Sequence, residues 1–268
     1  MTWERDEAKR VGIIRLNDPE RLNALTGAMG DEFAALVGRL EKSECEGLGA
    51  VVLTGAGRAF SAGGDLDFLR ARSRDTPSRN AVVMRRFYER FLSVRRLPVP
   101  VVSAINGPAI GAGLCVALAT DVRVAAKGAK LGVTFTQLGL HPGMGSTYFL
   151  PRIVGPQQAA WLLLTGRVVS GDEALRRGLV LDVHDTPEAC LAAAVQIAHE
   201  MAQAAPTAVR TCVRSLRMAA DDQLDKALWR EADAQAQCYA TKDLAEGVEA
   251  VAGKRKAVFT NWEGLADR

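Results

Sequence analysis

The stretch from Pro100 to Ala119 reads PVVSAINGPAIGAGLCVALA and is the most informative about the fold. The apolar run Val99–Ile105 predicts a β-strand that ends at the turn residues Asn106-Gly107-Pro108. Residues 113–119 are apolar on every side, which predicts a helix in the interior rather than on the surface. A buried strand joined to a buried helix through a glycine-rich loop indicates an α/β protein.

Strand signals recur on both sides of this stretch. Short apolar runs bounded by turn residues predict strands at Val11–Leu16, Ala50–Leu53, Val122–Ala125, Lys130–Gly132 and Leu179–Val183. Apolar residues at helical spacing predict a helix from Thr26 to Leu40, with Thr26 or Asp31 near its start. The chain thus alternates strands and helices over its first part.

Strand signals disappear after Pro187, where long alanine-rich helical stretches begin. We expect Pro206 and the pair Asp221-Asp222 to divide these helices. The chain is therefore predicted to consist of an α/β core over residues 1–200 and a helical C-terminal region over residues 201–268 that packs against it, since no long linker lies between them.

Composition excludes several classes of protein. The 268 residues carry 34 basic and 31 acidic side chains, a balance that argues against general nucleic-acid binding. Five scattered cysteines without a CxxC pair signal neither a zinc site nor a disulfide framework, and residues 1–10 lack a signal-peptide core. The apolar runs are too short to span a bilayer. We expect a cytoplasmic protein without a metal and without a nucleic-acid or membrane partner.

The charge is uneven along the chain. Residues 70–96 contain nine arginines and two acidic residues, so this segment has a net charge of +7. Such a segment suits a small polyanion, but a solvated helix face is the more common reason for it.

Glycine clusters follow three of the apolar segments, at 55–65, 107–113 and 139–145. None has the spacing of a dinucleotide-binding or P-loop motif. In the second cluster, Gly111-Ala112-Gly113 leads into the buried helix, whose first N–H groups are free to hold an oxyanion. The alternative is a glycine-rich turn that serves tight packing alone.

The ordered set of motifs resembles the enoyl-CoA hydratase/isomerase, or crotonase, family over essentially the whole chain. The residues that carry the resemblance are Asn17-Asp18-Pro19 with Asn23-Ala24-Leu25, Gly57 to Leu66, Pro100 to Ala119, Gly139 to Val154, Glu246-Gly247-Val248 and Lys254 to Phe259. The resemblance implies a spiral of repeated β-β-α turns with a helical C-terminal trimerisation region, and trimers that often pair into hexamers. It also implies that the ligand is an acyl-CoA thioester, with coenzyme A as part of the substrate and no separate cofactor.

The resemblance also implies roles for individual residues. The backbone N–H groups of Gly64 and Ala112 match the pair that holds the thioester oxygen in the family. The substrate-binding positions implied beside them are Ala62, Gly63, Asp65, Leu66, Gly111, Cys115, Phe135, Gly143, Lys256 and Phe259. Among these, Asp65 is expected to hold its loop, and Lys256 and Phe259 match tail residues that approach the coenzyme A.

The sequence departs from the family at the positions that carry acid–base carboxylates. Hydratases of the family have glutamate where this chain has Cys115 and Phe135, and some isomerases and dehalogenases have aspartate where it has Gly143. Each positioned acid or base contributes about 10²–10⁴-fold to a rate, so their loss bears directly on the reaction. His141 and Asp67 are candidate substitutes. A loop histidine and an acid at a helix N-terminus are the structural alternatives.

We therefore expect an acyl-CoA-processing enzyme that stabilises a thioester enolate. The alternatives are an enoyl-CoA isomerase or other CoA-thioester lyase or hydrolase that uses His141 or Asp67, and a non-catalytic acyl-CoA-binding protein.

Overall fold

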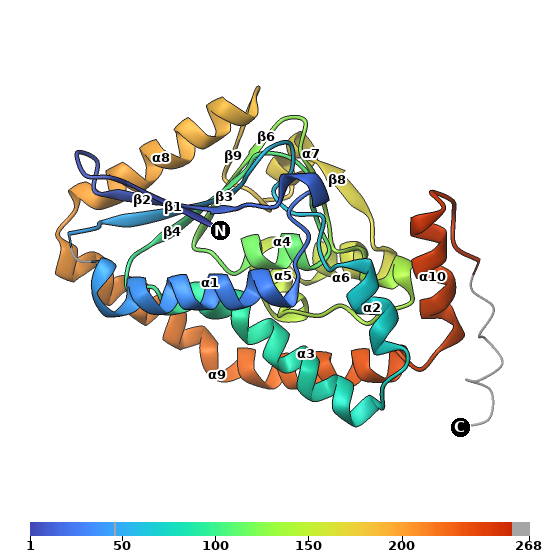
Figure 1. Cartoon of the computed structure of the whole chain (residues 1–268). Helices are drawn as coiled ribbons and strands as arrows, with labels where there is room; N and C mark the ends of the chain where they lie inside the picture. The colour runs from blue at the N-terminus through green and yellow to red at the C-terminus, as the bar shows by residue number, and fades with distance from the viewer. Residues whose placement is uncertain (46, 259–268) are drawn as a thin grey trace.

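Figure 1 shows the computed structural model, which describes residues 1–45 and 47–258. A six-stranded sheet with the order β1-β2-β3-β4-β6-β9 lies at its centre. β1 and β2 are antiparallel, and each later pair of neighbours is parallel. The strands are β1 (Thr2–Asp6), β2 (Val11–Leu16), β3 (Ala50–Gly55), β4 (Val101–Ile105), β6 (Val122–Ala126) and β9 (Asp182–His184). The strand predicted at Leu179–Val183 corresponds to β9, which starts three residues later, at Asp182.

A second sheet contains the short strands β5 (Ala109–Ile110), β7 (Lys130–Gly132) and β8 (Val168–Ser170). Along the chain, β4 of the first sheet is followed by β5 of the second, and β6 by β7. β5 leads into α4 (Ala112–Leu118), and β7 into the 3-10 helix η4 (Thr134–Leu138). This succession confirms the predicted α/β spiral of β-β-α turns.

Helices cover both faces of the large sheet. α8 (Pro187–Gln203) lies on one face and α4 on the other in Figure 1, and every residue of α4 is buried, as its uniformly apolar sequence predicts. The Thr26 side chain accepts a hydrogen bond from the N–H of Met29 and thereby caps α1 (Gly27–Arg39). The other helices of this part are α2 (Leu66–Arg72), α3 (Pro77–Leu92), α5 (Ser146–Val154), α6 (Pro156–Thr165) and α7 (Gly171–Arg176), with short turns at η1 (Pro19–Arg21), η2 (Leu40–Glu44) and η3 (Ser93–Arg96).

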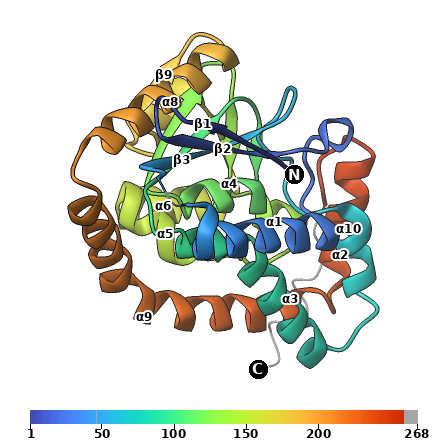
Figure 2. The same cartoon turned by 60° about the vertical axis from the view of Figure 1, so that its left-hand side comes forward.

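The last two helices are α9 (Pro206–Cys238) and α10 (Lys242–Ala252). The prediction that Asp221-Asp222 would divide a helix was wrong, because α9 runs through this pair without interruption and curves along its length in Figure 2. α9 packs against α3 and α5, and such tertiary contacts override the weak helix propensity of aspartate. Within residues 1–45 and 47–258, no helix is both long enough and apolar enough to cross a membrane.

Arg217 fixes α9 to the body of the molecule. Its guanidinium is buried and binds both carboxylate oxygens of Asp121, at 3.1 and 2.5 Å. It also donates to the backbone carbonyl groups of Arg95, Leu97 and Val99 at 2.8, 2.6 and 3.3 Å. One side chain thus joins α9 to the segment that enters β4.

Candidate active site

A cavity of about 260 Å³ lies between the glycine-rich loops and the helices α2, α3 and α9. Residues 62–64 form one wall, and Gly111 and Ala112 at the start of α4 form the wall beside it. These five residues come from two separate loops, and with Leu66 and Phe135 they make seven residues selected by the family resemblance that line one space.

Gly63 allows these two loops to approach closely. Its φ angle is +92°, and a Cβ atom added there would lie 2.5 Å from the carbonyl oxygen of Ile110 and 3.5 Å from the nitrogen of Ala112. Only glycine fits such a backbone conformation and such a contact. In the described part of the chain, no hydrogen-bond acceptor meets the N–H of Gly64 or the N–H of Ala112. These two donors are therefore available to a ligand.

Buried polar side chains brace the loop that carries Gly64. The Asn23 amide nitrogen donates to the carbonyl groups of Ala56 and Ala59, both at 2.9 Å. The Ser61 hydroxyl donates to the Asn23 carbonyl at 2.8 Å and accepts from the N–H of Gly63 at 3.2 Å. Asn23 has a positive φ of 55°, which asparagine tolerates better than most residues. The sequence indicated Asn23 only as part of the Asn23-Ala24-Leu25 motif. The left-handed backbone conformation at this position explains why asparagine is suited to it.

The rest of the cavity wall is largely apolar. Leu66 and Phe68 of α2, Met84 of α3, and Phe135 and Leu140 near η4 contribute to it. Among the described residues, no Asp, Glu, His, Lys or Arg lines the cavity. The space therefore suits an apolar group, and its wall supplies no carboxylate or imidazole for proton transfer.

Three polar side chains from α3, α9 and the residue after α9 line the cavity: Tyr88, Gln235 and Tyr239. Nothing in the sequence indicated Gln235. The Tyr88 hydroxyl donates to the Gln235 carbonyl oxygen at 2.7 Å, and the Gln235 amide donates to the carbonyl of His141 at 2.8 Å. A side chain at Gly143 would meet both groups at 2.5 Å. The volume next to Gly143 is thus filled by neutral groups. Burial raises the pKa of Tyr88 well above 10, so this phenol stays protonated.

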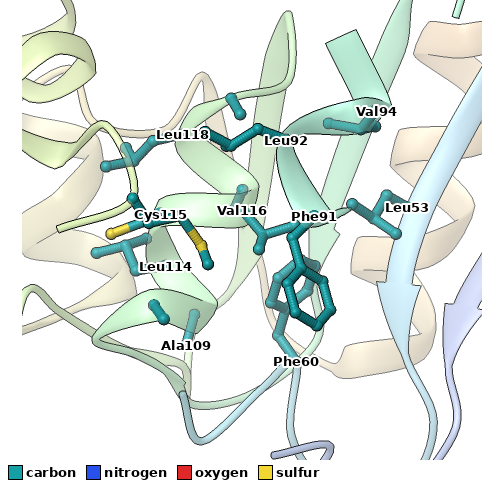
Figure 3. Close-up of a cluster of buried hydrophobic side chains, with 14 of the residues drawn as sticks. Leu53, Phe60, Phe91, Leu92, Val94, Ala109, Leu114, Cys115, Val116 and Leu118 are labelled. Carbon is teal, nitrogen blue, oxygen red and sulfur yellow. The ribbon is translucent and has the colours of Figure 1, made fainter. Parts of the chain in front are cut away.

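Cys115 lies in the core rather than in the cavity wall. Figure 3 shows it among apolar side chains, including Leu114 and Leu118. Its thiol donates weakly to the carbonyl of Gly111, 3.2 Å away, and burial raises the pKa of the thiol far above 9. This environment is that of an inert structural cysteine. Gly143 is likewise absent from the cavity wall.

Neither candidate substitute base lies at the cavity. His141 lines a separate open depression together with Arg230 and Asp233 of α9. Its Nδ1 is 2.7 Å from the carbonyl oxygen of Pro142, and burial lowers the pKa of the imidazole. The Asp67 side chain is 88% exposed and pairs with Arg70 in the first turn of α2. These positions give no support to acid–base roles for His141 and Asp67.

The remaining predicted residues have other surroundings. The Asp65 carboxylate caps α2 by accepting from the N–H of Phe68 at 3.0 Å, which agrees with a role in holding the loop. Lys256 is exposed, and Phe259 lies outside the described residues. Ion pairs with acidic side chains engage most arginines of residues 70–96, among them Arg70, Arg72, Arg79, Arg85, Arg90 and Arg96. This favours the solvated-face interpretation of that segment.

Glu231 of α9 occupies the start of α5, close to the cavity. Its buried carboxylate accepts hydrogen bonds from the N–H groups of Gly145 and Thr147, at 2.6 and 2.8 Å, and from the Thr147 hydroxyl. Burial nevertheless dominates and raises the pKa of Glu231 from 4.5 to about 7. Sequence reasoning had no signal for this residue, since its partners are far away along the chain.

The raised pKa predicts a pH-dependent stability. Between pH 4.5 and about 7, the folded protein keeps a proton on Glu231 that the unfolded chain has released. The free energy of unfolding should therefore fall by about 3 kcal/mol as the pH rises through this window, relative to a Glu231→Gln variant. Urea unfolding of both proteins from pH 4 to 8 measures the difference. A constant difference over that range would contradict the prediction.

Potential metal ligands do not gather in the described residues: no group of three or more His, Cys, Asp or Glu side chains there is placed to hold a metal ion.

Known proteins resemble this chain in sequence and in fold. The family model for enoyl-CoA hydratase/isomerase matches residues 6–262. The probable enoyl-CoA hydratase EchA14 of Mycobacterium tuberculosis H37Rv is 44% identical over 179 residues, which are 67% of this chain and 68% of that protein. The 1,2-epoxyphenylacetyl-CoA isomerase of Escherichia coli K12 is 34% identical over 253 residues, 94% of this chain and 95% of that one.

A solved structure extends the agreement to three dimensions. The crystal structure of an enoyl-CoA hydratase/isomerase from Pseudoalteromonas atlantica T6c matches with a TM-score of 0.81 and 33% identity. The match covers 97% of this chain and 99% of that chain. The chain belongs to the enoyl-CoA hydratase/isomerase family.

Proposed function

We propose that the protein is an acyl-CoA-processing enzyme in which the N–H groups of Gly64 and Ala112 form an oxyanion hole. The observation that supports this most is the pair of unpartnered donors on two loops, which meet at the wall of an apolar cavity. A thioester oxygen held by both donors gains negative charge when an enolate forms at the adjacent carbon. Donors fixed in advance stabilise that charge without rearranging.

The same cavity limits how the proton moves. Addition of water to an enoyl thioester needs one group to activate water and another to deliver a proton. Cys115 and Phe135 stand where hydratases of the family carry glutamate, and the described cavity wall has no carboxylate or imidazole. The relatives are named for hydration and for isomerisation, so both reactions are candidates for this chain. The same absence favours a second function, a non-catalytic acyl-CoA-binding protein.

The oligomeric state and location are part of the proposal. We infer a homotrimer or a hexamer formed through the region 201–268, because α9 exposes the large apolar side chains of Leu216, Met218 and Trp229. Exposed apolar groups that lie on one helix favour a protein interface. The five cysteines are scattered along the chain without a CxxC pair, which fits a reducing cytoplasm.

A panel of thioesters tests the proposed function. The protein is incubated with 2-enoyl-CoA and 3-enoyl-CoA substrates, while absorbance follows the conjugated enone and mass spectrometry identifies products. Loss of the enone with a gain of one water establishes a hydratase, and a gain of conjugation without a mass change establishes an isomerase. Binding without any turnover would favour the non-catalytic function, and no binding would overturn the assignment to acyl-CoA.

A further inference from the structure

Tyr239, which directly follows α9, lines the cavity, and its hydroxyl has only a weak hydrogen-bond acceptor among the described residues. The residue is 1% exposed, and its hydroxyl donates to the sulfur of Met84 at 3.2 Å. This thioether is its hydrogen-bond partner in the described part of the chain, and sulfur of this kind is a weak acceptor. A buried hydroxyl without a strong acceptor forgoes most of the energy that a hydrogen bond supplies.

The other tyrosine of the cavity differs in this respect. Tyr88 donates to the side-chain amide oxygen of Gln235 at 2.7 Å. Its hydrogen-bonding capacity is therefore used within the protein, whereas the donor of Tyr239 is available for exchange with a better acceptor. A ligand oxygen that reaches Tyr239 would replace a weak bond by a strong one.

The charges around Tyr239 restrict the kind of acceptor. No basic side chain lines the described cavity wall. Arg72 lies near enough to act on the Tyr239 hydroxyl electrostatically, but it pairs with Asp75 at 3.3 Å and its guanidinium lies over the ring of Phe68. A carboxylate in this cavity would lose its hydration without contacting a basic side chain of the wall, and Arg72 is already paired with Asp75. A neutral oxygen does not carry that penalty.

We propose that Tyr239 selects acyl-CoA thioesters whose acyl group carries a neutral oxygen away from the thioester, such as a ketone, an ether or a hydroxyl. This inference rests on the proposed function and specifies its substrate class. The thioester oxygen is held by Gly64 and Ala112, and the second oxygen accepts a hydrogen bond from Tyr239. Selection then depends on two fixed donors at separate places on one cavity wall.

Binding of length-matched thioesters tests the inference. Calorimetry compares hexanoyl-CoA with 4-oxohexanoyl-CoA and 5-oxohexanoyl-CoA. The two ketones place the second oxygen at two different distances from the thioester. We expect at least one ketone to bind about 3–10-fold more tightly than hexanoyl-CoA to the wild-type protein. In Tyr239→Phe, which removes a single oxygen, this ratio should fall to about 1 while hexanoyl-CoA still binds. A change of packing alone would weaken both ligands equally.

Two further variants make the test specific. Met84→Leu is close in size and removes the competing sulfur, so the preference for the ketone should rise. Tyr148→Phe changes a buried tyrosine outside the cavity wall and should leave the ratio unchanged.

Three outcomes would overturn the inference. If hexanoyl-CoA and both ketones bind equally tightly, and Tyr239→Phe does not change their affinities, the inference about Tyr239 is wrong. The proposed function would still stand. If hexanedioyl-CoA, whose acyl group ends in a carboxylate, binds more tightly than hexanoyl-CoA and both ketones, Arg72 and not Tyr239 recognises the acyl group. Failure of the wild-type protein to bind any of these thioesters would overturn the proposed function and the inference with it.

Discussion

Ala112→Pro is expected to lower thioester turnover by about 10²–10³-fold while the protein still folds. Proline replaces the hydrogen of the residue 112 N–H by a ring carbon, and it breaks no described hydrogen bond, since no described acceptor meets that N–H. Ala112 is the first residue of α4, and the first position of a helix is where proline is best tolerated. The loss of rate would then report one oxyanion donor rather than a damaged fold.

The control for this experiment is Ala112→Ser, which keeps the N–H and adds one oxygen. A dimethylaminocinnamoyl-CoA ligand gives a readout that does not depend on turnover, because its absorption moves to longer wavelength when its carbonyl oxygen accepts hydrogen bonds. The wild type and the serine variant should show this shift, and the proline variant should show much less of it. Full turnover and a full shift in Ala112→Pro would exclude the N–H of Ala112 from the oxyanion hole.

Arg217→Ala is expected to reduce the free energy of unfolding by about 3–5 kcal/mol. The substitution leaves the half-buried carboxylate of Asp121 without its guanidinium and takes from the carbonyl groups of Leu97 and Val99 the donor that they share. Loss of a hydrogen-bonded salt-bridge network whose guanidinium is buried is among the most costly changes a single mutation produces. Denaturant unfolding followed by circular dichroism measures the loss.

Two variants separate this effect from a general loss of positive charge. Arg214→Ala removes an exposed arginine one turn earlier on α9 and should change the free energy of unfolding by less than about 0.5 kcal/mol. Arg217→Lys keeps the charge but cannot reproduce the planar fork that binds both oxygens of Asp121, so its stability should lie in between. A loss below about 1 kcal/mol in Arg217→Ala would show that the buried network is not what fixes α9.

Much of the fold and the cavity loops was predictable because local sequence determines them. β2 and β7 have the predicted bounds, and the uniformly apolar stretch beyond Gly113 becomes the buried helix α4. Gly63 and Gly111 have positive φ angles of +92° and +54°, which few residues other than glycine adopt. The family resemblance then indicated which of the glycine loops meet, something that spacing alone does not give.

The contribution of α9 was not predictable in this way. Gln235 and Tyr239 reach the cavity, and Arg217 reaches the strand-entry segment, through contacts between residues far apart in sequence. Helical periodicity does not say which face of a long helix meets which neighbour. The same limitation explains the misplaced break at Asp221-Asp222, and it explains why His141 seemed a candidate base although it faces a different depression.

The absence of charged side chains from the described cavity wall has a consequence for how the ligand responds to solution conditions. Dissolved salt screens interactions between charges and leaves apolar burial and neutral hydrogen bonds largely untouched. The acyl end of a thioester would thus contribute the same binding free energy at low and high ionic strength. Any variation with salt would arise at the phosphates of coenzyme A, so the two ends of one molecule would be distinguishable by ionic strength alone.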